Sequence, residues 1–276
     1  MSSAHITFIG AGNMAEAILA GLLNHGHPAS HLRYSEPSPE RLEYMQKKYP
    51  AITQVFQDNA QAIEGVDVVI LAVKPQVMGN VVKNLPVTSD QLVISIAGGI
   101  ATPDILRWQP QITALVRCMP NTPALIGEGA VGLFPAAQVN DRQRARAEAI
   151  LRAISKQVVW VDKEPLMDTI TAVSGSGPAY FFLVMEAIQN AGIASGLTPE
   201  EAKALTVQTC LGAGRMALES DDDLATLRTK VTSPNGTTEA ALKSMEKDNI
   251  RKILHDAVMA AENRGREMAE EFGNKL

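Results

Sequence analysis

Hydrophobic residues follow two different spacings in this 276-residue chain, one before and one after about residue 160. In the first part, short runs rich in Val and Ile alternate with amphipathic helical stretches. The run Val68-Val69-Ile70-Leu71 has no polar break, which is typical of a strand buried on both faces of a sheet. This alternation predicts a mostly parallel sheet with helices on both sides, an α/β fold of the Rossmann type.

The same pattern places the individual elements of the first part. Apolar runs bounded by turn residues mark the strands, and the 3.6-residue period marks the helices between the early strands. Strands are expected at residues 5–9, 32–34, 66–72, 92–96, 112–117, 130–134 and 158–161, and helices at residues 13–25, 39–48 and 59–64.

After Pro165 the pattern becomes helical throughout, in segments rich in Ala, Leu, Met and Glu. This change predicts a first domain of residues 1–163 and an all-α second domain of residues 164–276. A helical domain with few aromatic residues and many Ala and Gly can pack closely against a copy of itself, so we expect a homodimer. Helices are expected at residues 179–195, 199–219, 224–229, 238–247 and 250–272.

Charge and composition limit the kinds of partner that the protein is expected to bind. The net charge of −5 and the lack of a long basic run argue against nucleic acid. Cys118 and Cys210 lie far apart and form no metal or redox spacing, so no metal site is predicted. No basic-then-apolar leader precedes the first strand, and no apolar run approaches the roughly 20 residues of a membrane span. A cytoplasmic location is therefore expected, with no membrane partner.

The segment Gly10-Ala11-Gly12-Asn13-Met14-Ala15 follows the first strand and opens a helix. It fits the dinucleotide fingerprint, in which the first glycine permits a tight turn and the second lets the pyrophosphate approach the backbone. The helix N-terminus supplies N–H donors for the phosphates. The sequence therefore predicts that NADH or NADPH binds here.

The end of the second strand should decide between these two cofactors. Glu36 stands where an acid would bind the ribose hydroxyls of NADH. Ser35, Ser38 and Arg41 could instead hold the 2′-phosphate of NADPH. The preference stays open at this point. Two further loops follow strands and are expected to line the same crevice, at residues 72–76 and 117–123.

The loop 231–238, VTSPNGTT, looks built to hold a small anion at the start of a helix. It contains hydroxyls and backbone amides but no His, Lys or Tyr that could donate a proton to a ketone. This combination favours a substrate with a carboxylate and a carbon–nitrogen double bond that already carries its proton. An alternative is that Thr238 is only the N-cap of the following helix.

Six motifs give the chain a close resemblance to the pyrroline-5-carboxylate reductase family over nearly its whole length. The motif at residues 227–246 is highly specific to that family, whereas the glycine fingerprint is shared by many unrelated enzymes. They are FIGAGNMAEAI (8–18), LAVKPQ (71–76), SIAGGI (95–100), RCMPNTPA (117–124), TAVSGSGPAY (171–180) and LRTKVTSPNGTTEAALKSME (227–246).

The resemblance implies an NAD(P)H-dependent reduction of 1-pyrroline-5-carboxylate to L-proline, the final step of proline synthesis. It implies a helical dimerisation domain, an active site near the dimer interface, and dimers able to assemble into larger rings. The substrate carboxylate would be held by the Gly236, Thr237 and Thr238 amides with Ser233 alongside. Val231 would line the pocket, and the Thr238 hydroxyl would face the imine nitrogen; Thr238 and Ser233 are the catalytic candidates.

The resemblance also implies the cofactor contacts. Together with Gly12 of the fingerprint, these are Gly10, Asn13, Met14, Ser35, Asn59, Ala72, Lys74, Ala97, Cys118 and Pro120. Glu36 does not fit a simple NADPH site, because a carboxylate pointing inward would repel the 2′-phosphate of NADPH.

Two other functions are weighed against this one. A hydroxyacid dehydrogenase of similar layout would need a catalytic lysine on a helix of the second domain, and Lys203 is the nearest candidate. A non-catalytic dinucleotide sensor would have no need of a second anion-binding loop. The sequence leaves open the assembly size, feedback inhibition by proline and activity on other cyclic imines.

Overall fold

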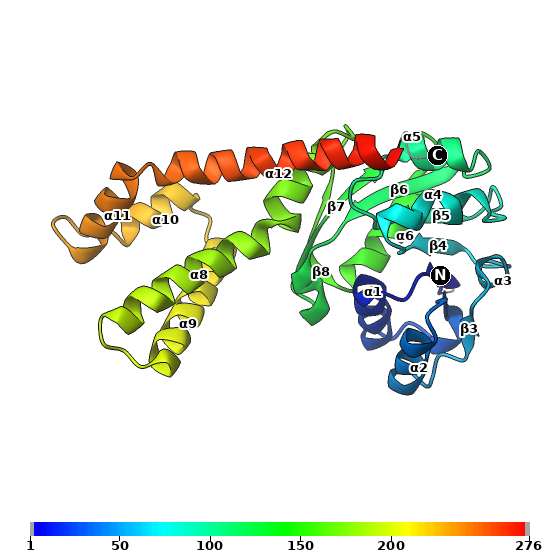
Figure 1. Cartoon of the computed structure of the whole chain (residues 1–276), viewed down its shortest axis with the longest axis horizontal. Coiled ribbons are helices and arrows are strands. Elements are labelled where there is room, and N and C mark those ends of the chain that lie inside the picture. The colour runs from blue at the N-terminus through cyan, green and yellow to red at the C-terminus, as the bar shows by residue number, and fades with distance from the viewer. Residues whose placement is uncertain (1–2, 274–276) are drawn as a thin grey trace. The chain divides into compact units, whose positions relative to one another are not determined.

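The structure, a computed structural model, describes residues 3–273. These residues form two compact units (Figure 1). Unit 1 contains the chain up to Ser176 together with the segment from Ala260 onward, and unit 2 contains Gly177–Met259. The last helix, α12 (Ile250–Gly273), therefore starts in unit 2 and ends in unit 1.

Unit 1 is built on an eight-stranded sheet with the order β3-β2-β1-β4-β5-β6-β7-β8. Strands β1 to β6 run parallel, β7 runs antiparallel to β6, and β8 runs parallel to β7. All four residues of β1 and of β4 are buried, so both faces of the sheet centre are covered. The strands are β1 (Ile6–Ile9), β2 (Leu32–Ser35), β3 (Gln54–Phe56), β4 (Val68–Leu71), β5 (Leu92–Ser95), β6 (Ala114–Met119), β7 (Gly129–Pro135) and β8 (Ser155–Trp160).

The helices of unit 1 include the connections that the parallel strands require. Several begin at a proline or behind a capping side chain; Asn140, for example, forms a capping box with Gln143 at the start of α6. In chain order they are α1 (Asn13–Asn24), η1 (Ala29–His31), α2 (Pro39–Lys48), α3 (Asn59–Ala62), α4 (Pro75–Lys83), α5 (Thr102–Trp108), η2 (Thr122–Ile126), α6 (Asp141–Arg152), α7 (Leu166–Ile170) and the π-helical turn η3 (Thr171–Gly175).

The mostly parallel sheet is confirmed, and each of the expected strands is present with shifted ends. Strand β3 was not predicted, because three half-buried residues carry almost no periodic signal. Helices α4 and α5 also lay outside the expected set.

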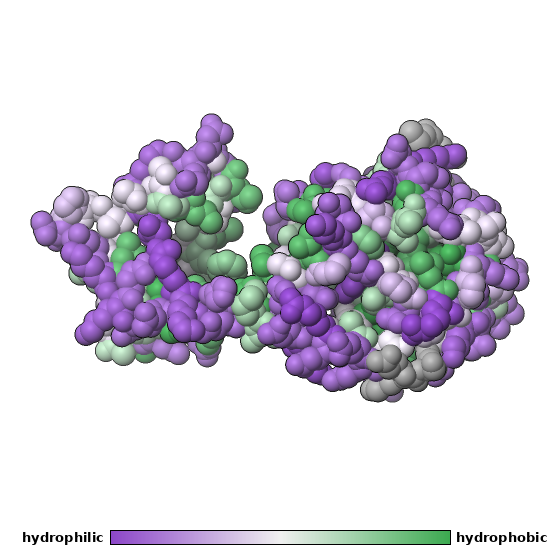
Figure 2. Space-filling model, turned by 90° about the horizontal axis from the view of Figure 1, so that it is seen from above, coloured by the Kyte–Doolittle hydropathy of each residue, from purple (hydrophilic) through white to green (hydrophobic). Residues whose placement is uncertain are grey.

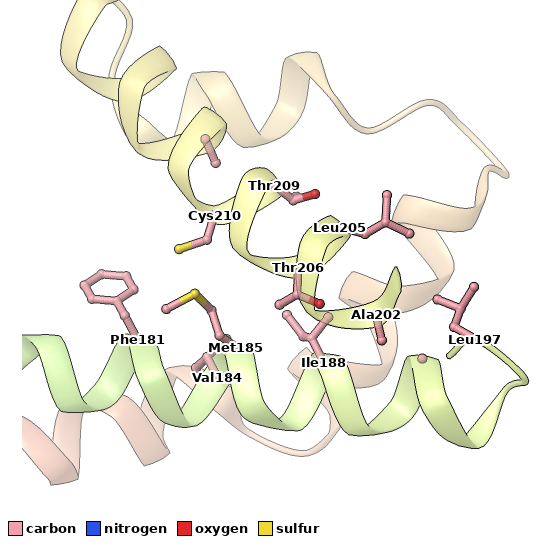
Figure 3. A pocket seen from close by; sticks show the side chains of 12 residues that line it. Phe181, Val184, Met185, Ile188, Leu197, Ala202, Leu205, Thr206, Thr209 and Cys210 are labelled. Carbon is pink, nitrogen blue, oxygen red and sulfur yellow. The ribbon is translucent and has the colours of Figure 1, made fainter. Parts of the chain in front are cut away.

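Unit 2 is helical, as expected, and its helices fall close to the predicted ranges. They are α8 (Gly177–Ala194), α9 (Pro199–Glu219), α10 (Leu224–Lys230), α11 (Thr237–Lys247) and the start of α12. Helices α8 and α9 lie side by side and leave a groove of about 440 Å³ between them (Figure 3). Its apolar lining includes Phe181, Val184, Met185 and Ile188 of α8 and Leu205 and Cys210 of α9.

Residues 164–176 pack with the sheet, although the sequence groups them with the helical domain. Arg117 on β6 pairs with Glu164 at 3.1 Å and with Asp168 at 3.2 Å. Asn121 donates a hydrogen bond to the Ser174 carbonyl at 3.1 Å. These contacts explain why the compact units divide after Ser176; the domain boundary at residue 163 stays a prediction. No helix within residues 3–273 is both long and apolar enough to cross a membrane.

Candidate functional site

The carboxyl ends of the parallel strands bring most of the predicted cofactor residues to one edge of the sheet. Gly10 follows β1, and Ala72 follows β4, which is the neighbour of β1. Chain order reverses between these two strands, since β2 and β3 lie on one side of β1 and β4 to β6 on the other. Ligands of open α/β sheets bind in the crevice at such a switch point. Ser35, Lys74, Ala97, Cys118 and Pro120 belong to the same edge by their positions at or just beyond the ends of β2, β4, β5 and β6.

The turn at Gly10 requires a residue without a side chain. Gly10 has φ of +92°, and a Cβ there would lie 2.9 Å from the Ala72 carbonyl oxygen. The Gly10 N–H donates to the Ser35 carbonyl at 2.9 Å, so the turn is tied to β2 as well. The side chain of Ser35 is fully buried. Through its backbone, Ser35 therefore shapes the turn, and its contact with a cofactor stays a prediction.

Gly12 differs from Gly10, because a Cβ at Gly12 would meet no heavy atom within 4 Å. The residue is the N-cap of α1, and no side chain caps this helix end. Asn13 and Met14 thus present their backbone N–H groups at an open helix N-terminus, which attracts anions. An open space in front of uncapped amides fits the pyrophosphate of a dinucleotide.

Two charged side chains hold the peptide of Ala11 in the middle of this turn. Glu36 Oε2 accepts a hydrogen bond from the Ala11 N–H at 2.9 Å, and Oε1 accepts one from the Ser38 N–H at 3.0 Å. Arg41 Nε donates to the Ala11 carbonyl at 2.6 Å. The carboxylate of Glu36 therefore points toward the glycine-rich turn.

Glu16 anchors Arg41 from behind, a role that the sequence reasoning missed. Its carboxylate accepts hydrogen bonds from Arg41 Nη2 at 2.5 Å, Lys48 Nζ at 2.7 Å and the Tyr49 hydroxyl at 3.0 Å. Burial raises the pKa of Glu16, but the hydrogen bonds from Lys48, Arg41 and Tyr49 outweigh burial and hold the pKa at about 2. The sequence does contain a signal for this ion-pair cluster. Glu16 is an acidic residue in the first turn of α1, and Arg41 and Lys48 are basic residues seven positions apart in α2.

The remaining crevice residues differ in exposure. Lys74 is exposed at the N-cap of α4, and Asn59 is half-buried at the start of α3. Cys118 is buried, and burial raises the pKa of its thiol, so it is not a thiolate nucleophile at neutral pH. Asn121 links the following loop to the π-helical turn through its bond to Ser174.

The loop 231–238 lies in unit 2 and leads into α11. Asn235 has a left-handed φ of +56°, and its N–H donates to Glu239 Oε2 at 2.8 Å. The Gly236 N–H donates to the Ser233 carbonyl at 3.0 Å. That amide is thus engaged within the loop, which leaves the Thr237 and Thr238 N–H groups at the open end of the helix.

The alternative of Thr238 as an N-cap is wrong, because the cap is Gly236 and α11 begins at Thr237. No side chain caps α11. Thr238 is the second residue of α11, so it belongs to the first turn of the helix. Val231, Ser233, Thr237 and Thr238 are all exposed in the single chain, so each is accessible to a small molecule.

Fold and site together define a class: an α/β dinucleotide-binding protein of the Rossmann type with an added helical unit. Residues 164–268 match the family model for pyrroline-5-carboxylate reductase dimerisation, and residues 5–99 match that for the NADP oxidoreductase, coenzyme F420-dependent family. The pyrroline-5-carboxylate reductase of Pseudomonas aeruginosa is 46% identical over 275 residues, covering 99% of this chain and 100% of the relative. The chain belongs to the pyrroline-5-carboxylate reductase family.

Solved structures of the family have the same fold. A pyrroline-5-carboxylate reductase of Coxiella burnetii has a TM-score of 0.90 at 43% identity, over 97% of this chain and 99% of that one. The pyrroline carboxylate reductase of Plasmodium falciparum, crystallised with NADP bound, has a TM-score of 0.86 at 31% identity, over 98% of this chain and 99% of that one. The expected resemblance is therefore confirmed.

Proposed function

We propose that the protein reduces 1-pyrroline-5-carboxylate to L-proline with NADH or NADPH as the hydride donor. The observation that carries the proposal is the presence of an uncapped helix N-terminus in each unit, at Gly12 and at Gly236, in a chain of this family. The first suits the cofactor's pyrophosphate, and the second suits a carboxylate. The sequence similarity to named pyrroline-5-carboxylate reductases favours this activity over a hydroxyacid dehydrogenase or a sensor.

In the cofactor site, the residues of this chain bind and orient. The backbone N–H groups of Asn13 and Met14 would hold the pyrophosphate, and the open space at Gly12 admits it. Ala72, Lys74, Ala97 and Pro120, with Asn59 and the backbone of Cys118, would line the rest of the crevice. A bound nicotinamide supplies the hydride.

In the substrate loop, the Thr237 and Thr238 N–H groups would hold the carboxylate, with Ser233 and Val231 beside it. Gly236 shapes the loop, since its own N–H bonds to Ser233. The Thr238 hydroxyl would hydrogen-bond the imine nitrogen and orient the ring. An iminium carries its proton before reduction, so the site needs no general acid.

We infer that a second copy of the chain covers the helical unit. Large apolar side chains of α8 and α9 are exposed in the single chain, and Figure 2 shows apolar patches on this unit among polar residues. Phe181, Phe182 and Leu183 are each more than 60% exposed. Burying such a surface stabilises an obligate dimer. The match of residues 164–268 to a dimerisation model supports this inference, and larger rings stay part of the proposal.

The proposal is tested by mixing the purified protein with NADPH or NADH and 1-pyrroline-5-carboxylate. We expect oxidation of the nucleotide together with formation of proline in a one-to-one ratio. Nucleotide binding without turnover would contradict the proposal. Sedimentation of the same preparation tests the dimer, and a monomer at micromolar concentration would contradict that part.

A further inference from the structure

The negative charge of Glu36 is fixed at the end of β2 by the backbone of the glycine-rich turn. One carboxylate oxygen accepts the Ala11 N–H at 2.9 Å and the other accepts the Ser38 N–H at 3.0 Å. Each oxygen has a further lone pair, so the carboxylate can still accept a hydroxyl. In this fold an acid at this position meets the ribose hydroxyls of the adenosine half.

Of the three groups that could hold a 2′-phosphate, Arg41 and Ser38 form hydrogen bonds within the chain and Ser35 is buried. Arg41 donates through Nε to the Ala11 carbonyl and through Nη2 to Glu16, and its guanidinium lies 4.7 Å from the centre of the Tyr44 ring. The Ser38 hydroxyl oxygen accepts the Arg41 N–H at 3.3 Å. The side chain of Ser35 is fully buried.

Glu16 remains ionised at neutral pH and forms an ion pair with Arg41. Its two oxygens are shared between Arg41 and Lys48, and its side chain is 12% exposed. Because the pKa of Glu16 lies at about 2, the pair persists over the physiological range. Arg41 is thereby held against the turn rather than left free to reach toward an anion.

We propose that Glu36 accepts the 2′-hydroxyl of the adenosine ribose, and that Glu16, by holding Arg41 against Ala11, makes the chain bind NADH in preference to NADPH. The inference rests on the dinucleotide site of the proposed function and adds the cofactor selectivity of that site. Glu36 is the residue that touches the cofactor. Glu16 is a positioning residue that acts through Arg41.

The test measures binding rather than turnover. NADH and NADPH are titrated separately into the whole protein without substrate, and the nucleotide fluorescence gives each Kd. The wild type is compared with Glu36→Gln, Glu36→Ser and Glu16→Gln. The control is Glu43→Gln, which removes an equal charge from the exposed face of α2. Circular dichroism verifies that each variant is folded at the titration temperature.

We expect the wild type to bind NADH at least about tenfold more tightly than NADPH. Both substitutions of Glu36 should move the ratio of the two Kd values toward NADPH by about tenfold, which corresponds to roughly 1.4 kcal/mol. Glu16→Gln should tighten NADPH by about threefold or more and leave NADH within twofold. The Glu43→Gln control should keep the wild-type ratio.

Several results would overturn the inference. Equal or tighter binding of NADPH by the wild type would do so, and so would a Glu36→Gln ratio equal to that of the control. An unchanged ratio in Glu16→Gln would remove that residue from the selectivity. Failure to bind either nucleotide would overturn the proposed function as well. The expected ratios without turnover of 1-pyrroline-5-carboxylate would support the inference and contradict only the proposed substrate.

Discussion

Two glycines two residues apart should lose different amounts of stability on the same substitution to alanine. Gly12 has φ of −66° and ψ of 178°, which alanine adopts without strain, and its Cβ would enter open space. Replacing an N-cap glycine by alanine costs about 0.5–1 kcal/mol of stability. Gly10 has φ of +92°, and its Cβ would meet the Ala72 carbonyl oxygen at 2.9 Å. Alanine there should cost at least about 2 kcal/mol, from the left-handed backbone and the close contact together.

Gly12→Ala should weaken cofactor binding although it costs little stability. The new methyl group of Gly12→Ala would stand where the pyrophosphate has to approach the N–H groups of α1. Losing one charge-assisted hydrogen bond costs roughly 1.5–3 kcal/mol, which raises the Kd by about tenfold to a hundredfold. Urea denaturation without nucleotide measures the first effect, and fluorescence titration with NADH and NADPH measures the second. Wild-type nucleotide affinity in Gly12→Ala would refute the assignment of this turn to the pyrophosphate.

Three other changes have defined outcomes. Thr238→Ala should lower kcat by about tenfold or more and leave the Kd for the nucleotide unchanged, because only the orienting hydroxyl is lost; steady-state kinetics with wild-type kcat would remove Thr238 from the mechanism. Arg117→Met should reduce the free energy of unfolding by about 3–5 kcal/mol, because Glu164 and Asp168 lose the buried cation between them; a loss below about 1 kcal/mol in urea would show that the ion pairs contribute little. Glu16 has its pKa lowered from 4.5 to about 2, so its contribution is present above pH 4.5 and is lost as the pH falls toward 2. The gap in unfolding free energy between wild type and Glu16→Gln should thus be roughly 3 kcal/mol at neutral pH and should shrink over that interval; a gap independent of pH would contradict the assignment.

Strong periodic signals predicted most of the fold. The apolar runs of β1 and β4 predict strands that are buried on both faces of a sheet. The glycine fingerprint directly after β1 predicts a helix with an open N-terminus. The three residues of β3 were missed, because so short an edge strand lacks a period. The grouping of residues 164–176 with the sheet depends on long-range pairs such as Arg117 with Glu164, which no local pattern contains.

The site was predicted only in part, because local spacing identifies some of its residues and the fold brings the others together. Local spacing identifies Gly10 and the loop before α11, since glycine and hydroxyl residues stand at fixed positions relative to a helix start. The hydrogen bonds of Glu36 are different, because they depend on how β2 lies beside the turn after β1. Glu16 and Arg41 are 25 residues apart and meet only when α1 and α2 are in place. The N–H of Gly236 donates to the Ser233 carbonyl and closes a four-residue turn that the sequence does not reveal.

The central claim is that hydride passes from a nicotinamide dinucleotide to the imine carbon of 1-pyrroline-5-carboxylate on this protein. The most direct measurement uses NADH or NADPH labelled with deuterium at the transferable position and mass spectrometry of the product. We expect L-proline that carries one deuterium on the former imine carbon, formed in step with nucleotide oxidation. Unlabelled substrate recovered alongside bound, unoxidised nucleotide would contradict the account.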